Sequence, residues 1–195
     1  MKLTTICVLG LALVAGQSRA QDGRWITLLD GTNMGDWTRL GAANWRLEGG
    51  AVVADKKENE KENGNFLVTK NSYKDFEIRA EFWVSDDANS SIFIRCEHGK
   101  VTATDCYEVN IFDQRPDPSY GTGAITDNVA KVDPMPKAGG KWNTYEITAQ
   151  GNHLVVVLNG QKTVDIENSK HSSGPIGLQY GQGIVKFRKF QIRSL

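Results

Sequence analysis

The segment "CYEVNIFD", residues 106–113, carries two acids and an amide in a run otherwise rich in β-branched and aromatic residues. These three are Glu108, Asn110 and Asp113. β-branched and aromatic residues favour strands, and side chains alternate between the two faces of a strand. The apolar residues between them would face the core. The pattern therefore predicts that Glu108 and Asn110 share the opposite face, close enough to act on one ligand.

Asp113 does not have the parity of Glu108 and Asn110. Two interpretations are open. Asp113 starts a loop, or a bulge near Phe112 turns its side chain back beside the other two.

The preceding run, "SSIFIRC", extends the polar face. Alternation places Ser91, Phe93 and Arg95 on one side, and pairing with 107–111 as a hairpin would bring Arg95 near Glu108. Such a pair binds a ligand or is a cross-strand ion pair of little consequence.

Trp83 lies on the polar face of another alternating run, "DFEIRAEFWVS", and is a candidate stacking platform for a sugar. We expect Arg95, Glu108, Asn110 and Trp83 to line one concave cavity. A polar cluster with an aromatic side chain on one sheet face is suited to a small polar ligand.

The rest of the chain reads as short strands separated by Gly, Asn, Asp and Pro clusters, without a long helical period. Gly49-Gly50 and Asn159-Gly160 mark tight hairpin turns. The charged run 55–65 is typical of a solvated loop. The sequence therefore predicts an all-β fold, a sandwich or jelly roll.

Residues 1–20 have the pattern of a cleaved signal peptide: basic Lys2, an apolar run and a small-residue end at Ala20. The apolar run is shorter than the ~20 residues of a membrane-spanning helix. We therefore expect a bacterial protein that is periplasmic or secreted, with residues 21–195 forming a single domain and no membrane association after cleavage. Cys7 would leave with the peptide.

The chain has 23 basic and 23 acidic residues, and loss of Lys2 and Arg19 gives a net charge of −2. This balance gives no bulk attraction for nucleic acid. The three histidines, His98, His153 and His171, lack metal-ligand spacing, so neither a metal nor another cofactor is expected.

Cys96 and Cys106 bracket the presumed loop of the hairpin, and an exported protein would allow them to form a disulfide. The two cysteines would point to different faces, however: Cys96 has the strand parity of Ile92 and Ile94, whereas Cys106 has the parity of Glu108. A disulfide needs both Cβ atoms to point toward each other, so parity allows at most a distorted bond. Bridged and free cysteines both remain open.

The order of ten segments resembles the 3-keto-disaccharide hydrolase family of exported bacterial proteins. The resemblance spans about Trp25 to Leu195, and its segments are "WITLLDGTNMGDW", "WRLEGGAVV", "FLVTKNSYKDFEIRAEF", "NSSIFIRC", "YEVNIFD", "TGAI", "KWNTYEI", "VVVLNG", "GPIGLQYG" and "VKFRKFQI". It implies a concanavalin-like jelly roll of two antiparallel sheets with a concave ligand face. It also implies activity on glycosides that a partner dehydrogenase has oxidised at C3, or hydration of the unsaturated intermediate.

A ketone at C3 acidifies the C2 proton, so a base can remove it, the C1 group can leave and water can add back. For this chemistry the resemblance suggests Glu108 as base or acid, Asp113 as its partner and Arg95 as the cation for the enolate. Asn110 and Gln179 would orient the sugar. Ser91 and Trp83 complete the expected substrate site.

Four positions depart from the family pattern: Ser91 replaces Gly, Asn110 replaces Gln, Tyr180 replaces His and Lys189 replaces Asn. With Tyr180 in place of the family's histidine, a possible proton-transfer group is missing, and the identity of the substrate stays open.

Two other functions remain open. One is a non-catalytic sugar-binding module. The other is direct hydrolysis of ordinary glycosides, for which carboxyl groups ~5 Å apart would indicate retention and ~6.5–9.5 Å inversion.

Overall fold

A computed structural model of the chain describes residues 23–59 and 65–195. The expected signal peptide, 1–20, lies outside the described residues, as do positions 60–64 of the charged run. Within the described part of the chain, no helix is long and apolar enough to cross a membrane.

The described residues form thirteen strands and two short 3-10 turns, η1 (Glu97–Gly99) and η2 (Pro118–Tyr120). The strands are β1 (Ile26–Leu29), β2 (Trp37–Leu40), β3 (Arg46–Glu48), β4 (Ala51–Ala54), β5 (Phe66–Thr69), β6 (Phe76–Val84), β7 (Ser90–Ile94), β8 (Tyr107–Ile111), β9 (Trp142–Gln150), β10 (His153–Leu158), β11 (Gln161–Glu167), β12 (Gly177–Gln179) and β13 (Val185–Ser194).

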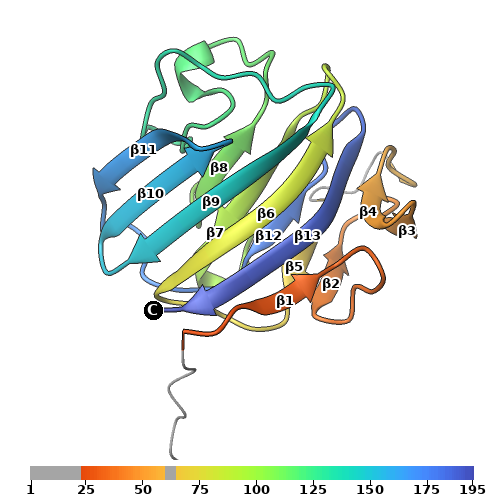
Figure 1. The fold of residues 1–195 in the computed structure, drawn as a ribbon, viewed down its shortest axis with the longest axis horizontal. Coiled ribbons are helices and arrows are strands. Elements are labelled where there is room, and N and C mark those ends of the chain that lie inside the picture. The colour runs from red at the N-terminus through yellow and green to blue at the C-terminus, as the bar shows by residue number, and fades with distance from the viewer. Residues whose placement is uncertain (1–22, 60–64) are drawn as a thin grey trace, which may run out of the picture.

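The strands make two antiparallel sheets packed face to face. One sheet has eight strands, in the order β11-β10-β9-β6-β13-β4-β3, with β1 also paired to β13. The other has five strands, in the order β2-β5-β12-β7-β8. Figure 1 shows the eight-stranded sheet in front of the five-stranded sheet. The predicted all-β jelly-roll fold is confirmed.

Alternation along the strands separates core from surface as predicted. On β6 the residues from Phe76 to Val84 with even numbers are buried, and those between them are partly or fully exposed. On β8 the residues Tyr107, Val109 and Ile111 are at most 1% exposed and belong to the same core. Glu108 and Asn110 therefore lie on the outer face of the five-stranded sheet.

Both predicted hairpin turns are present. Gly49 and Gly50 join β3 to β4 with φ of 59° and 74°. Asn159 and Gly160 join β10 to β11 with φ of 51° and 81°. Two consecutive positive φ values give the turn a twist that matches the flanking strands, which explains the residue choice.

Tyr145 on β9 connects the two sheets directly behind the polar face. Its hydroxyl donates to the backbone oxygen of Asn110 at 2.6 Å and accepts from the backbone nitrogen of Gly123 at 2.9 Å. Burial raises the pKa of Tyr145, so the hydroxyl stays a protonated donor. It fixes β8 and the segment 112–137, which Figure 1 shows arching above the end of β8.

Candidate functional site

Four of the predicted residues meet on the outer face of the five-stranded sheet. In the β7–β8 pair, Asn110 lies opposite Ser91, and Glu108 lies opposite Phe93. β12 is the other neighbour of β7, and the Ser90 hydroxyl donates to the backbone oxygen of Gln179 at 2.7 Å. The side chain of Gln179 follows core-facing Leu178 and so points to the outer face.

Two hydroxyl groups hold the carboxylate of Glu108. Oε1 lies 2.8 Å from Oγ of Ser91, and Oε2 accepts from Oγ1 of Thr126 at 2.5 Å. Thr126 also donates its backbone N–H to the backbone oxygen of Glu108 at 3.1 Å. The side chain of Glu108 is partly buried, and its orientation is set from both sides.

The Ser91 hydroxyl suits a carboxyl group that changes its protonation state. Its oxygen lies within hydrogen-bond distance of Glu108 and also of the backbone oxygen of Ser90, at 2.6 Å. A hydroxyl has one proton to donate and can accept as well. Ser91 can therefore donate to ionised Glu108, or accept from protonated Glu108 while donating to Ser90.

Asn110 has a structural part in this arrangement. It is fully buried, its Nδ2 donates to the backbone oxygen of Tyr120 at 2.7 Å, and its Oδ1 lies 3.2 Å from Oγ of Ser91. Asn110 therefore anchors the segment 112–137 to the sheet, and its predicted direct contact with a sugar does not fit these bonds.

Gln179 is different, because its Oε1 is buried and has no hydrogen-bond partner among the described residues. A buried polar atom without a partner is costly, and such atoms often bind water or a ligand.

An apolar cluster adjoins the polar groups on the same face. Phe93, opposite Glu108, packs edge-on against Phe66 of β5 with ring centroids 5.3 Å apart. Val101, from the loop between β7 and β8, belongs to the same cluster as Cys96 and Cys106. The carboxylate and the amide thus adjoin a packed apolar cluster in which Phe93 and Phe66 are 2% and 7% exposed.

Cys96 and Cys106 are bonded to each other, so the free-thiol alternative is wrong. The parity argument failed because β7 ends at Ile94 and Arg95 has a φ of 53°. This left-handed residue interrupts the alternation and turns Cys96 to the outer face, where Cys106 already lies.

The disulfide should stabilise the fold by about 2–3 kcal/mol, because it closes a short loop in the unfolded chain. Replacing both cysteines with serine should lower the free energy of unfolding by that amount in urea titrations. An unchanged unfolding midpoint and m-value would contradict this expectation.

The predicted position of Arg95 beside Glu108 is wrong. The side chain is 1% exposed; its Nε donates to Lys74 O at 2.8 Å and its Nη1 to Gly151 O at 2.8 Å. Nη1 also contacts His171 O, and Nη2 contacts Asp75. Because the backbone of Arg95 is left-handed, its side chain does not follow the strand alternation. Its guanidinium binds backbone oxygens of neighbouring loops and does not lie beside Glu108.

Asp113 lies in the loop after β8, as the first of the two interpretations expected. Its Oδ1 accepts from the Thr122 hydroxyl at 2.6 Å, and its Oδ2 accepts from the backbone nitrogens of Ala138 and Gly139, each at 2.9 Å. No bulge turns it back toward Glu108, because β8 ends at Ile111. Through these bonds Asp113 joins Thr122 to Ala138 and Gly139.

Trp83 lies on the other side of the molecule, so the predicted single cavity is wrong. Its neighbours Phe82 and Val84 are core residues of the eight-stranded sheet, which places Trp83 on the outer face of that sheet. Glu108 is on the outer face of the five-stranded sheet. Shared parity on two separate strands does not reveal whether the strands share a sheet.

Thr126 is the site residue that the sequence did not reveal. It lies in an irregular segment, where no strand alternation predicts the direction of a side chain. Its only sequence signal is its position next to the "TGAI" segment.

Thr126→Val should lower kcat/KM about tenfold, because it removes one hydrogen bond to the carboxylate of Glu108 while keeping the side-chain shape. Thr126→Ser should restore most of the rate, since it keeps the hydroxyl. Equal losses in both variants, in steady-state assays on correctly folded protein, would argue against positioning by the hydroxyl.

No group of three or more His, Cys, Asp or Glu side chains is placed to hold a metal within residues 23–59 and 65–195.

The family of the chain is decided by its match to the model of the 3-keto-alpha-glucoside-1,2-lyase-like domain, which covers residues 24–193. The chain belongs to this family. A curated relative, a 3-keto-disaccharide hydrolase of Bacteroides thetaiotaomicron, is 24% identical over 72% of this chain. The aligned part spans only 58% of that longer protein.

Two crystal structures of candidate glycosyl hydrolases from Parabacteroides distasonis are similar to this lyase-like domain. One has a TM-score of 0.76 at 16% identity, covering 88% of this chain and 94% of that one. The other has a TM-score of 0.71 at 25% identity, covering 88% of this chain and all of that one. Family and fold thus agree with the resemblance seen in the segments of the sequence.

Proposed function

We propose that the domain is an exported carbohydrate-active enzyme that cleaves 3-keto glycosides, or hydrates the intermediate of that cleavage, with Glu108 as the base. The observation that carries the proposal is the carboxylate of Glu108, oriented by Ser91 and Thr126 on the sheet face that also carries Gln179. Family membership supports the substrate class. A separate dehydrogenase would supply the ketone at C3.

In the proposed reaction Glu108 removes the C2 proton, which the neighbouring ketone has acidified. The electron pair of the C2–H bond forms the C1–C2 double bond, and the C1–O bond breaks. Protonated Glu108 passes this proton to the departing aglycone oxygen, and the first product is an unsaturated 3-keto sugar. Water then adds at C1 and gives its proton to Glu108, which delivers it to C2.

The residues around Glu108 have distinct parts in this scheme. Thr126 keeps Oε2 in place, while Ser91 accommodates both protonation states at Oε1. The amide nitrogen of Gln179, on the same outer face, is the donor that we assign to the enolate oxygen. This assignment replaces Arg95, whose donors are engaged elsewhere.

Direct hydrolysis of an ordinary glycoside requires two carboxyl groups on either side of the bond. The second carboxylate that the sequence suggested, Asp113, is engaged by backbone N–H groups. The geometry therefore favours the single-base elimination.

The test compares one disaccharide in its 3-keto and its ordinary form. Incubation with the whole protein should release free sugar from the 3-keto form only. Release from the ordinary form at a similar rate would contradict the elimination. Saturable binding of both forms without release would instead identify a non-catalytic sugar-binding module.

A further inference from the structure

The five tryptophans of the chain divide into two groups. Trp37 and Trp45 are core residues, 6% and 1% exposed. Trp83 and Trp142 are paired across β6 and β9 on the outer face of the eight-stranded sheet, and Trp142 is 38% exposed. Trp25, just before β1, lies over the same face. This face is opposite to the one that carries Glu108.

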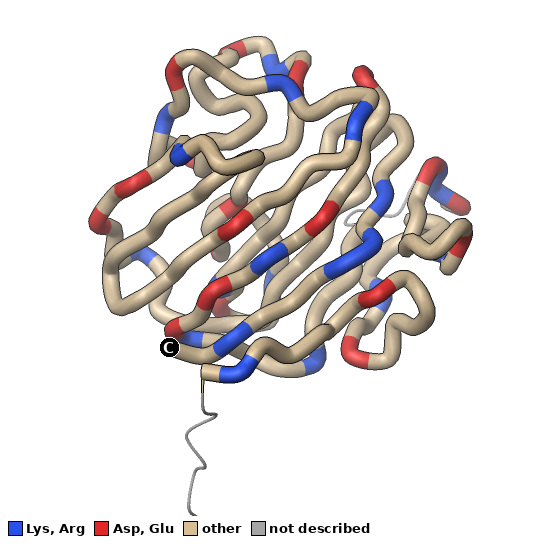
Figure 2. The backbone as a smooth tube through the Cα atoms, viewed as in Figure 1, with Lys and Arg blue, Asp and Glu red and all other residues tan. Residues whose placement is uncertain are grey.

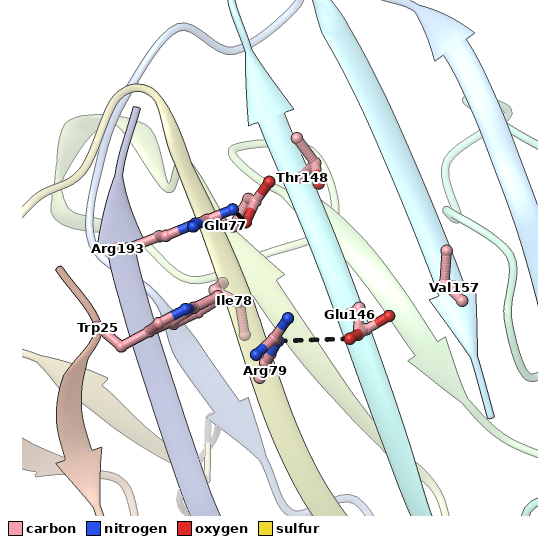
Figure 3. A pocket seen from close by; sticks show the side chains of 8 residues that line it. All are labelled: Trp25, Glu77, Ile78, Arg79, Glu146, Thr148, Val157 and Arg193. Carbon is pink, nitrogen blue, oxygen red and sulfur yellow. Dashed lines mark hydrogen bonds and ion pairs between the residues drawn. The ribbon is translucent and has the colours of Figure 1, made fainter. Parts of the chain in front are cut away.

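Trp25 borders a hollow of about 210 Å³ on this face. Figure 3 shows its indole ring between Arg193 and Arg79, with Glu77 and Glu146 on the strands beside them. The guanidinium carbon of Arg79 lies 4.5 Å from the centroid of the ring, and that of Arg193 lies 5.0 Å from it. The hollow therefore offers an indole flanked by two exchangeable cations, together with hydrogen-bond donors and acceptors.

Two ion pairs flank the ring. In one, the Arg193 Nε donates to Glu77 Oε2 at 2.6 Å, and the two side chains are 34% and 27% exposed. Arg79 and Glu146 approach to 3.3 Å, and their side chains are 52% and 49% exposed. Exposed ion pairs of this kind contribute little to stability, so their groups can exchange partners at low cost. Figure 2 shows acidic and basic positions mixed on β6 and basic positions along β13, so both signs of charge are present on this sheet.

The same combination recurs farther along β6. Lys186 Nζ lies 4.8 Å from the centroid of Trp83, and the guanidinium carbon of Arg188 lies 4.1 Å from that of Trp142. Trp83 is four residues from Arg79 on β6, which corresponds to roughly 13 Å along an extended strand. Aromatic groups thus stand near both ends of one sheet face, with charged side chains between them.

This pattern fits a neutral, hydroxyl-rich chain better than a protein surface. A protein interface usually has a continuous apolar centre, whereas charged rows separate these indoles. A sugar ring has an apolar C–H face for the indole and a rim of hydroxyls that both donate and accept. Charges of mixed sign match such a rim.

We propose that the outer face of the eight-stranded sheet is a second binding surface, for a neutral oligosaccharide. One sugar ring occupies the hollow beside Trp25, and the chain continues toward Trp83 and Trp142. The inference does not depend on the reaction at Glu108, because the two outer faces are separated by the core.

The test uses the indole N–H signals of the whole protein in two-dimensional NMR, with the two core tryptophans as internal controls. Maltohexaose and cellohexaose are titrated separately as probes. With at least one probe, the signals of Trp25, Trp83 and Trp142 should shift saturably while those of Trp37 and Trp45 stay in place. No saturable shift with either probe would overturn the proposal.

Variants separate the two faces. Trp25→Ala should weaken binding of the active probe about tenfold, since it removes the stacking surface of the hollow. Gln179→Ala, which alters the opposite outer face, should leave that affinity unchanged. Thermal unfolding of both variants checks that they fold. If Trp25→Ala does not fold, Trp25→Phe replaces it, because phenylalanine keeps an aromatic ring but a smaller one. Unchanged affinity in Trp25→Ala, or a loss of affinity only in Gln179→Ala, would contradict a site on this face.

Discussion

Glu108→Gln should lower turnover of a 3-keto disaccharide by about 10²–10⁴-fold, because the amide keeps the shape of the side chain but cannot accept the C2 proton. The amide of glutamine can still contact Ser91 and Thr126, so the site geometry should change little. Substrate affinity should therefore stay close to that of the parent protein. Single-turnover assays and equilibrium binding measure the two quantities separately.

Asp113→Asn is the matched control, since it also converts an acid to an amide in the segment after the same strand. Its carboxylate accepts from the backbone nitrogens of Ala138 and Gly139. We expect this variant to lose stability and to keep most of the turnover per folded molecule. Unchanged turnover in Glu108→Gln would remove Glu108 from the mechanism.

Arg95→Met should lower the free energy of unfolding by about 2–4 kcal/mol, because it removes the four hydrogen bonds of a buried guanidinium. The oxygens affected are the carbonyls of Lys74, Gly151 and His171 and the carboxylate of Asp75. Denaturant unfolding monitored by fluorescence measures the loss. Turnover per folded molecule should change less than about threefold.

The alternative, in which Arg95 stabilises an enolate, predicts a different pattern. A catalytic cation should cost about 10²-fold or more in turnover when removed, with little dependence on stability. Arg95→Lys discriminates further: an ammonium keeps the charge but cannot reproduce the planar fork that reaches three carbonyls. A lysine variant that unfolds early but turns over normally supports the structural role, whereas normal stability with lost turnover would restore the catalytic one.

The sequence was sufficient for most of the fold. Alternating burial on β6 and β8 follows from period-two hydrophobic patterns, and the turns at Gly49-Gly50 and Asn159-Gly160 follow from residues that tolerate positive φ. These features depend on neighbours within a few residues, so local rules determine them.

The site was predictable only where such local rules hold. Glu108, Ser91 and Gln179 lie on one face because β7, β8 and β12 are regular strands in one sheet. Arg95 and Cys96 were misassigned because a single left-handed residue ended the alternation. No pattern of residue types predicts a left-handed backbone at an arginine.

The position predicted for Trp83 was wrong, and Thr126 was missed, for a different reason. Placing Trp83 needed the assignment of β6 to a sheet, which depends on pairing with β9 and β13 far along the chain. Placing Thr126 needed the path of an irregular segment, which is fixed by bonds such as that of Tyr145 to Gly123. Both are long-range contacts that alternation cannot reveal.

The most direct test of the account is the fate of the C2 hydrogen when the reaction runs in D₂O. Elimination followed by addition of water breaks the C2–H bond, so the released 3-keto sugar should carry deuterium at C2, beyond the exchange seen without protein. Glu108→Gln should abolish this protein-dependent incorporation. Efficient release of a sugar that retains its original C2 hydrogen would contradict base removal at C2 and favour direct cleavage of the glycosidic bond.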